Sequence, residues 1–259
     1  MTDNKIDAVK HLMENKKETL RMKKNEWGRD FVVGDIHGCY SELQAILQSI
    51  KFNVSRDRLI CCGDLTDRGP DSSLVANYVK QSWFYSIMGN HDECILWAFT
   101  KKPGFALDRW YSDSVGGYWW STLSSGEQFE IAFQVAQLPT AIELDSPIGK
   151  VGFAHAGIPF QKNWPTHLEK INKKHNETIS HTLWDRSHAV VDTPTITGID
   201  YVFIGHTTFA ETTIKNNSIF VDTGAGYQHY PNDNALYNPK GRLNVVEINK
   251  ETLSSFKRK

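Results

Sequence analysis

Between residues 31 and 92, three short apolar segments each stop at a glycine that is followed by potential metal ligands. The segments 31–33, 59–62 and 83–88 lead into Gly-Asp-Ile-His-Gly at 34–38, Gly-Asp-Leu-Thr-Asp-Arg-Gly at 63–69 and Gly-Asn-His-Asp at 89–92. Apolar segments of this length that end at glycine predict buried strands. Because ligands bind at the carboxyl ends of the strands in an open α/β sheet, the three polar clusters are expected to converge.

The converging side chains are carboxylates, imidazoles, a carboxamide and a guanidinium, and this chemistry is typical of a divalent metal site. Such ligands suit manganese, iron, zinc or magnesium better than a thiolate-bound metal, and a set of this size can hold two ions. Any one of the three loops alone is better explained as an ordinary turn. Three in register after buried strands do not fit that explanation. The candidate residues are Asp35, His37, Asp64, Asp67, Arg68, Asn90, His91 and Asp92.

The order of apolar patterns predicts an α/β fold. After each ligand loop, residues 40–50, 73–80 and 92–99 place apolar side chains on one helical face, and this strand–helix alternation implies a mostly parallel sheet covered by helices. Closely spaced strands at 141–144, 151–154, 201–204, 218–221 and 243–248 predict a second, partly antiparallel sheet. The 259 residues and 40% hydrophobic content allow a sizeable core.

Further candidate site residues lie in the second half of the chain. His155 and His206 each follow a predicted buried strand by one or two residues, so we interpret both as metal ligands. Residues 162–200 are polar and are expected to be loop-like, but Arg186 within them offers a second guanidinium for phosphate oxygens. Residues 101–137 are rich in aromatic side chains and predict an inserted helical lobe with those side chains in its own core.

The composition limits the partners and the compartment. A net charge of −1 gives no overall attraction for nucleic acid or an anionic membrane, and no apolar segment is long enough to span a bilayer. Cys39, Cys61, Cys62 and Cys94 form no Cys-x-x-Cys pair and are expected to be reduced thiols of a cytoplasmic protein. Residues 1–28 predict an amphipathic helix that packs weakly.

A pair of divalent ions bridged by a carboxylate activates a water and binds phosphate oxygens, so the residues favour phosphoester hydrolysis. Arg68 and Arg186 would neutralise the remaining phosphate oxygens, and His91, paired to an acid, would protonate the departing alkoxide.

The motifs at 34–38, 63–69 and 89–92, with His-Ala-Gly at 155–157 and Gly-His-Thr at 205–207, resemble the ordered motif set of the calcineurin-like metallophosphoesterases. Within that superfamily the chain is most similar to the bacterial and bacteriophage-lambda type serine/threonine protein phosphatases, from about residue 31 to 248. This resemblance implies a four-layer αββα sandwich of two mixed sheets flanked by helices. We therefore expect an N-terminal extension at 1–28, a metallophosphoesterase domain at 29–250 that includes the lobe at 101–137, and a basic tail at 251–259.

The resemblance also implies a role for each site residue. Two divalent ions, commonly manganese with iron, zinc or magnesium as alternatives, would be bridged by Asp64. His91 matches the general acid and Asp67 the carboxylate that orients it, while Arg68 and Arg186 match phosphate clamps. The implied ligands are Asp35, His37 and Asp64 for the first ion and Asp64, Asn90, His155 and His206 for the second.

The expected activity is hydrolysis of phosphoserine and phosphothreonine monoesters in a protein or peptide, with phosphotyrosine left open, by direct attack of a hydroxide that bridges the metals. Asp92 stands where the protein phosphatases more often have Glu, and symmetrical diadenosine tetraphosphatases often have Asp there. Those hydrolases usually lack the acid present here as Asp67, which favours the protein phosphatase. A non-catalytic metal-binding scaffold is the third alternative, although no ligand is missing. We expect a monomer.

Overall fold

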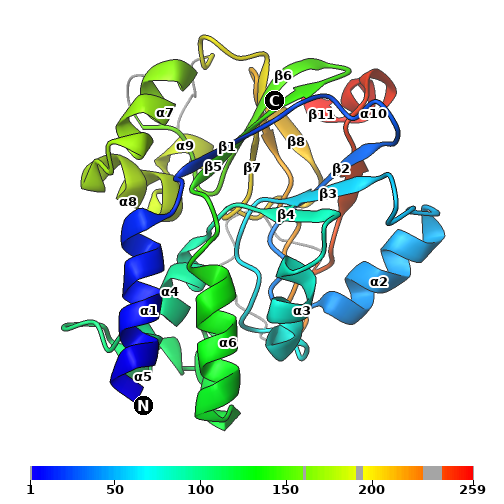
Figure 1. Ribbon diagram of the computed structural model, residues 1–259. Coiled ribbons are helices and arrows are strands. Elements are labelled where there is room, and N and C mark those ends of the chain that lie inside the picture. The colour runs from blue at the N-terminus through cyan, green and yellow to red at the C-terminus, as the bar shows by residue number, and fades with distance from the viewer. Residues whose placement is uncertain (1, 160–161, 191–194, 230–240, 259) are drawn as a thin grey trace.

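Two β-sheets stacked face to face form the centre of the computed structural model, and helices cover their outer sides (Figure 1). The structure describes residues 2–159, 162–190, 195–229 and 241–258. The smaller sheet has the strand order β10-β2-β3-β4, and the larger sheet has the order β1-β5-β6-β7-β9-β8-β11. The smaller sheet contains β2 (Asp30–Val33), β3 (Arg58–Cys61), β4 (Phe84–Ser86) and β10 (Val245–Glu247). The larger sheet contains β1 (Thr19–Met22), β5 (Ala141–Ser146), β6 (Gly149–Ala154), β7 (Tyr201–Ile204), β8 (Thr213–Lys215), β9 (Ser218–Phe220) and β11 (Lys257–Arg258).

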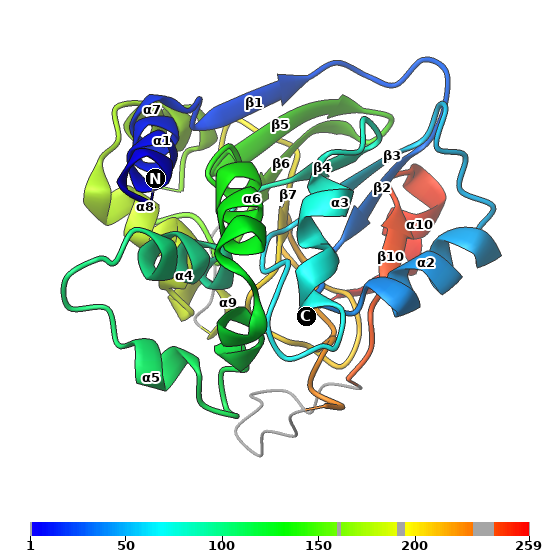
Figure 2. The ribbon, with the colours of Figure 1, turned by 60° about the horizontal axis from the view of Figure 1, so that its bottom comes forward.

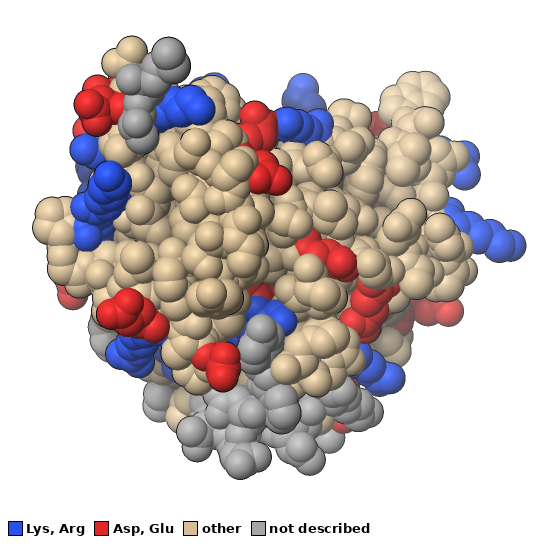
Figure 3. Space-filling model, turned by 90° about the horizontal axis from the view of Figure 1, so that it is seen from below, with Lys and Arg blue, Asp and Glu red and all other residues tan. Residues whose placement is uncertain are grey.

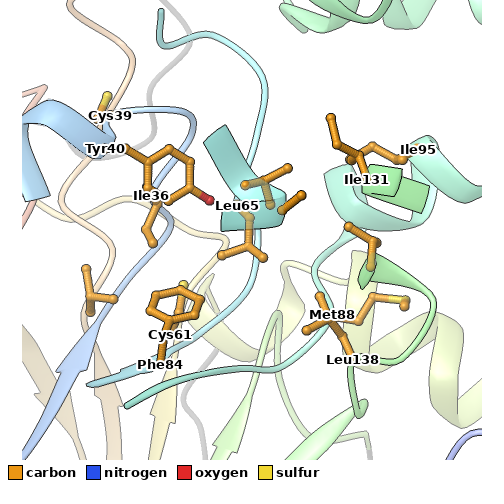
Figure 4. Packing of buried hydrophobic residues seen from close by; sticks show 14 of the residues in the cluster. Ile36, Cys39, Tyr40, Cys61, Leu65, Phe84, Met88, Ile95, Ile131 and Leu138 are labelled. Atoms are coloured by element: carbon orange, nitrogen blue, oxygen red, sulfur yellow. The ribbon is translucent and has the colours of Figure 1, made fainter. Parts of the chain in front are cut away.

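Both sheets are buried on both faces, because successive strand residues point into different apolar layers. Val32 and Ile60 face the larger sheet, in one cluster with Phe153 and Phe203. Their sequence neighbours on β2 and β3 face the opposite way, into a cluster with helices α1 (Thr2–Asn15), α2 (Tyr40–Ser49), α3 (Val75–Val79), α4 (Asn90–Phe99) and α6 (Ser125–Val135). In that outer cluster Tyr40 points toward Leu65, and Phe84 lies beside Cys61 (Figure 4). A third cluster lies between the larger sheet and helices α7 (Trp164–Asn172) and α9 (Ser187–Val190). The predicted four-layer arrangement of two mixed sheets flanked by helices is confirmed.

The helices that form the outer layers agree with most of the expected positions. The segments expected at 40–50, 73–80 and 92–99 correspond to α2, to η1 with α3 and to α4, and α6 lies within the helical lobe expected at 101–137. The helices are α1 (Thr2–Asn15), α2 (Tyr40–Ser49), η1 (Ser72–Leu74), α3 (Val75–Val79), α4 (Asn90–Phe99), α5 (Leu107–Trp110), η2 (Gly117–Thr122), α6 (Ser125–Val135), α7 (Trp164–Asn172), α8 (Asn176–Trp184), α9 (Ser187–Val190) and α10 (Lys250–Ser255).

Strand register brings the ligand loops together at one edge of the sandwich. In the smaller sheet β2, β3 and β4 are parallel, with Val33 opposite Cys61 and Cys61 opposite Ser86. In the larger sheet β6, β7 and β9 are also parallel, with Ala154 opposite Ile204 and Ile204 opposite Phe220. The loops that follow all six strands therefore begin at neighbouring positions, as expected for a site at strand carboxyl ends.

The N-terminal segment packs more tightly than the sequence predicted. Val9 of α1 is fully buried in the outer cluster of the smaller sheet. Farther along, β1 pairs in parallel with β5, and Thr140 donates hydrogen bonds to Glu18 through its backbone N–H (2.8 Å) and its hydroxyl (2.6 Å). Four-residue strands such as β1 are too short to give a clear alternation, so the sequence offered little sign of this pairing. The domain boundaries at 28/29 and 250/251 stay predictions.

The expectation of a loop-like 162–200 region is wrong, because α7, α8 and α9 lie within it. Trp164, Leu168 and Ile171 form one buried face of α7, and Asn163 caps the helix by accepting a hydrogen bond from the N–H of Thr166 at 2.9 Å. Few apolar residues in a polar stretch are enough for a helix when they recur at this spacing. Tertiary burial then stabilises a segment that composition alone describes as a loop.

Candidate metal centre

Several residues of the convergent loops have left-handed backbone conformations. The φ angles are 44° at His37, 50° at Asp64, 73° at Asp67, 64° at Arg68 and 61° at His206. Non-glycine residues adopt such angles at a cost that the surrounding structure must offset, and they cluster at functional sites. Here the loops are tied to each other: the N–H of His37 donates to the carbonyl of Asp64 at 2.9 Å, and the N–H of Gly69 donates to that of His37 at 2.8 Å.

Asp92 connects two of these loops and does not reach into the centre. Its carboxylate accepts hydrogen bonds from the backbone N–H of Leu65 at 3.0 Å and of Gly89 at 2.8 Å. Burial, followed by the nearby charge of Asp64, raises the pKa of Asp92 to about 7. The Asp92 side chain therefore holds the 63–69 loop to the start of α4.

Asp64 lies in the middle of the cluster and is buried. Its Oδ2 is 3.7 Å from Nε2 of His37 and 3.9 Å from Nε2 of His91, and its Oδ1 is 3.4 Å from Nε2 of His155. Burial alone would raise the pKa of Asp64, but the neighbouring imidazoles, with His155 first, lower it well below its usual value. The two oxygens of Asp64 thus face two different sets of nitrogens, which is the geometry a bridging ligand needs.

One set of donors is formed by Asp64, Asn90, His155 and His206. Nε2 of His155 lies 2.9 Å from Oδ1 of Asn90, and the other ring nitrogen of His155 is held by the carbonyl of Cys62 at 2.7 Å. Such a backbone contact on the far nitrogen fixes ring orientation, as it does for metal-binding histidines. Nε2 of His206 is buried and has no hydrogen-bond partner within the described structure. His206 has a ligand atom within 4.8 Å of ligand atoms of Asp64 and His155, so an unsatisfied buried nitrogen on its imidazole fits a divalent ion.

Asp35 and Asp222 complete the charged interior. Both oxygens of Asp35 accept the backbone N–H of His206 at 3.0 Å. Burial and then the charge of Asp222 raise the pKa of Asp35 well above its usual value, and burial raises that of Asp222 to about 6. Buried carboxylates that repel one another are stabilised by bound cations. Asp222 is not among the site residues predicted from the sequence, although it follows a predicted strand as the other ligand candidates do.

Asp67 and His91 form a buried pair beside the centre. Oδ2 of Asp67 accepts a hydrogen bond from Nδ1 of His91 at 2.5 Å and from the indole N–H of Trp110 at 2.7 Å, and Oδ1 accepts the indole N–H of Trp119 at 2.6 Å. The two tryptophans come from the lobe, whose aromatic side chains were expected to form a local core. That expectation holds for packing, since Trp110 and Trp120 are buried, but it misses these two polar contacts. These contacts join residues that are distant in the sequence, so only the tertiary structure reveals them.

The two predicted phosphate clamps occupy different settings. Arg68 donates from Nη1 to Nε2 of His37 and lies 3.4 Å from Nε2 of His91 through Nη2. Ligation of an ion by His37 therefore requires the contact with Arg68 to open. Arg186 donates to the backbone carbonyl of His206 at 2.9 Å. Both guanidiniums border the cluster. The structure therefore brings together the residues that the sequence predicted for the site, except Asp92, whose carboxylate connects two loops instead.

Two groups of side chains have ligand atoms close enough to hold an ion: His37 with Asp64 and His91, and Asp64 with His155 and His206. Asp64 belongs to both, and this is the position that a bridging ligand would occupy. Asp35 lies beside the first group, with Oδ2 4.0 Å from Nε2 of His37. The donor types are oxygen and imidazole nitrogen, which suit a divalent ion of the first transition row. The described residues thus fit a pair of ions.

Comparison with known proteins places this geometry in a family. Residues 31–208 match a family model whose description is "Calcineurin-like phosphoesterase". The chain is 32% identical over 202 residues to "Serine/threonine-protein phosphatase 2" of Salmonella typhimurium, which covers 75% of this chain and 87% of the relative. It is 33% identical over 155 residues to the symmetrical bis(5'-nucleosyl)-tetraphosphatase of Photorhabdus laumondii, covering 58% of this chain and 50% of the relative.

Among solved structures, a protein serine/threonine phosphatase of Saccharomyces cerevisiae with similarity to human phosphatase PP5 superposes with a TM-score of 0.57 at 15% identity, covering 96% of this chain and 82% of the other. At that identity the likeness concerns the fold. The family match spans every predicted metal-ligand loop, and the ligand side chains lie together at the ends of the two sheets. The chain therefore belongs to the calcineurin-like phosphoesterase family.

Proposed function

We propose that this protein is a metal-dependent phosphoprotein phosphatase that hydrolyses phosphoserine and phosphothreonine monoesters. The observation that carries the proposal is the buried Asp67–His91 pair: His91 is hydrogen-bonded to Asp67 through Nδ1, and its Nε2 lies 3.9 Å from Oδ2 of Asp64, the residue shared by the two groups of potential ligands. The relatives named as serine/threonine-protein phosphatases, which match about three quarters of this chain, support the same substrate class.

Each side chain of the site has a role in this reaction. Asp35, His37, Asp64, Asn90, His155 and His206 would hold two divalent ions, whose Lewis acidity activates water and neutralises phosphate charge when they are bound. Arg68 and Arg186 border the cluster and would bind the remaining phosphate oxygens. Nδ1 of His91 bonds to Asp67, so Nε2 is the atom that faces the centre and can give a proton to the leaving oxygen.

Manganese is the proposed metal, because imidazole and carboxamide donors favour it over magnesium. Attraction for the phosphate is local: the face in Figure 3 carries its basic and acidic side chains scattered mostly toward the edge, and the chain has a net charge of −1. The four cysteines are buried and free, which supports the proposed cytoplasmic location. None of the helices among the described residues is long and apolar enough to cross a bilayer.

A symmetrical dinucleoside tetraphosphatase is the second candidate, because relatives with that name also match the chain, although over a shorter part of it. A panel of manganese-loaded reactions separates the two. We expect kcat/KM to be highest for phosphoserine and phosphothreonine peptides, lower for p-nitrophenyl phosphate, and lowest for diadenosine tetraphosphate. If diadenosine tetraphosphate is the best substrate, the proposal is wrong. The non-catalytic scaffold would hydrolyse none of them.

The role of His91 has a separate test. His91→Asn is expected to lower kcat on a phosphoserine peptide by about a hundredfold or more, the usual scale for general acid catalysis. The loss is smaller on p-nitrophenyl phosphate, whose leaving group is stable as an anion. Metal content, measured by atomic emission, stays unchanged. A variant that loses a metal ion, or that loses activity equally on both substrates, would show that His91 is a ligand or a general electrostatic group.

A further inference from the structure

A cleft of about 690 Å³ opens directly from the candidate metal centre. Its inner end is lined by Asn90, His91 and His206, and its outer end by aromatic side chains of α4, α8 and the segment that leads into α5. Figure 2 shows α5 and its connecting loops on the outer side of α4. This volume lies in the range of pockets that bind small ligands or peptide side chains. The reaction described above does not use its outer end.

The outer end is an aromatic wall. Trp97 and Trp184 stack in parallel, with ring centroids 5.6 Å apart and an angle of 4° between the planes. Phe105 packs its ring against Trp97 at 5.5 Å, and Trp184 is 39% exposed. The indole N–H of Trp184 donates to Glu93 at 2.7 Å, which holds the stack in place. A rigid, partly exposed apolar surface beside a reaction centre is suited to binding part of a substrate.

The lysine and arginine side chains that line the cleft give its lining a positive charge. Lys102, Arg109 and Arg186 line it, and none of its described lining residues is Asp or Glu. A substrate segment there should therefore be apolar or acidic, and a basic residue should be excluded by repulsion.

The α4 residues that line the cleft give the distance from the metal centre to the aromatic wall. Asn90, Cys94 and Trp97 lie on one face of α4 and all line the cleft. Seven helical residues at 1.5 Å each separate Trp97 from Asn90 by roughly 10 Å. An extended peptide covers about 3.3 Å per residue, so a side chain about three residues from the phosphorylated one reaches the aromatic wall.

We propose that this cleft is a specificity subsite that binds a large apolar side chain located about three residues from the phosphorylated residue of a protein substrate. The inference rests on the proposed function. A nucleobase is the competing occupant, and it binds by stacking on a free ring face. Trp97 already stacks on Trp184 and carries the Lys102 ammonium 3.8 Å from its ring centroid, so its faces are engaged and its edges remain for contact with an alkyl or phenyl group.

The experiment uses the manganese-loaded full chain and phosphothreonine peptides that carry Phe, Ala or Lys at one position from −4 to +4. We expect kcat/KM to be about tenfold higher for Phe than for Ala at one position near −3 or +3, the scale of partly burying a phenyl ring. Lys at that position should be the poorest. Trp184→Ala should remove the preference for Phe and leave the all-Ala peptide within about twofold. Trp27→Ala, which changes a tryptophan that is 87% exposed, is the matched control and should keep the preference.

A second variant tests the charge of the cleft. Lys102→Glu should raise kcat/KM for the Lys peptide relative to the Ala peptide. Equal kcat/KM for all peptides, or a Phe preference that survives in Trp184→Ala, overturns the subsite while leaving the proposed function intact. If Trp184→Ala impairs the hydrolysis of diadenosine tetraphosphate and no peptide is hydrolysed, the cleft binds a nucleobase, and both the subsite and the proposed function are wrong.

Discussion

Replacing Asp67 by asparagine is the most informative perturbation of this site, because each carboxylate oxygen has defined donors. Oδ2 accepts from His91 and Trp110, and Oδ1 accepts from Trp119. An asparagine has one oxygen and one NH₂ group. If its oxygen takes the Oδ2 position, the contacts of His91 and Trp110 survive, and the NH₂ group faces the indole N–H of Trp119. The opposite orientation loses two contacts, so the first is favoured.

The expected cost of Asp67→Asn is therefore one unsatisfied indole N–H at a carboxylate position that is fully buried. Leaving such a donor without a partner costs about 1–3 kcal/mol in the free energy of unfolding. Trp119→Phe removes that donor. In its background the NH₂ group no longer faces an N–H, so Asp67→Asn should cost less by about 1–3 kcal/mol. The loss of charge is common to both backgrounds and cancels in the double-mutant cycle.

The assay is urea unfolding of the four metal-loaded proteins, followed by circular dichroism so that loss of a tryptophan does not affect the signal. Trp164→Phe serves as a matched control, because its indole N–H also donates to a carboxylate, Glu143, at 2.8 Å, but on the outer side of the larger sheet. Its effect should add to that of Asp67→Asn within about 0.5 kcal/mol. If Trp119→Phe and Asp67→Asn are also additive, the Trp119 indole does not hold the carboxylate and the reasoning fails. Activity should fall less in Asp67→Asn than in His91→Asn, because the retained oxygen still orients the imidazole.

Four further predictions concern metals, thiols, acid stability and the N-terminal helix. Chelation should abolish activity and manganese should restore more of it than magnesium, and Asp64→Asn should lower the content of both ions, as measured by atomic emission. Peroxide should leave activity unchanged, and a thiol reagent should find no fast-reacting group in the native protein. The reason is that all four cysteines are buried and burial raises the pKa of Cys39 to about 12. A fast phase in the thiol reaction, together with loss of activity, would instead support redox control through the ligand strands. Burial lowers the pKa of His167 to about 3, so the unfolded chain takes up the proton first as the pH falls. The free energy of unfolding should therefore fall by up to about 1.4 kcal/mol per pH unit between about pH 6.5 and 3; His167→Gln should flatten this slope in urea titrations, and the exposed His11→Gln should not. Val9→Ala should lower the free energy of unfolding by about 2 kcal/mol, whereas the exposed Lys10→Ala should change it little, and equal effects would mean that α1 packs weakly after all.

The sequence alone was sufficient for the parts of the site that follow from strand ends. An apolar segment that stops at glycine predicts a buried strand and the position where that strand ends and its polar loop begins. In a parallel sheet the ends of neighbouring strands lie side by side, so the polar loops do as well. This is why the pattern of apolar segments is enough to predict that Asp35, Asp64, Asn90, His155 and His206 meet in one site. The same logic applied to 218–221 would have included Asp222, which follows that strand directly.

Tertiary structure alone decided the contacts between residues that are distant in the chain and share no pattern. Trp110 and Trp119 lie more than forty residues from Asp67 in sequence. The sequence of an aromatic lobe does not show whether its indole N–H groups donate to water or to a carboxylate. The pairing of β1 with β5 and the helices within 162–200 depend on burial against partners that local composition does not reveal. Periodicity and turn chemistry are properties of neighbouring residues, so they specify elements and loop ends. Which side chains satisfy one another's hydrogen bonds, and which apolar faces enclose a cleft, is determined only when those elements pack.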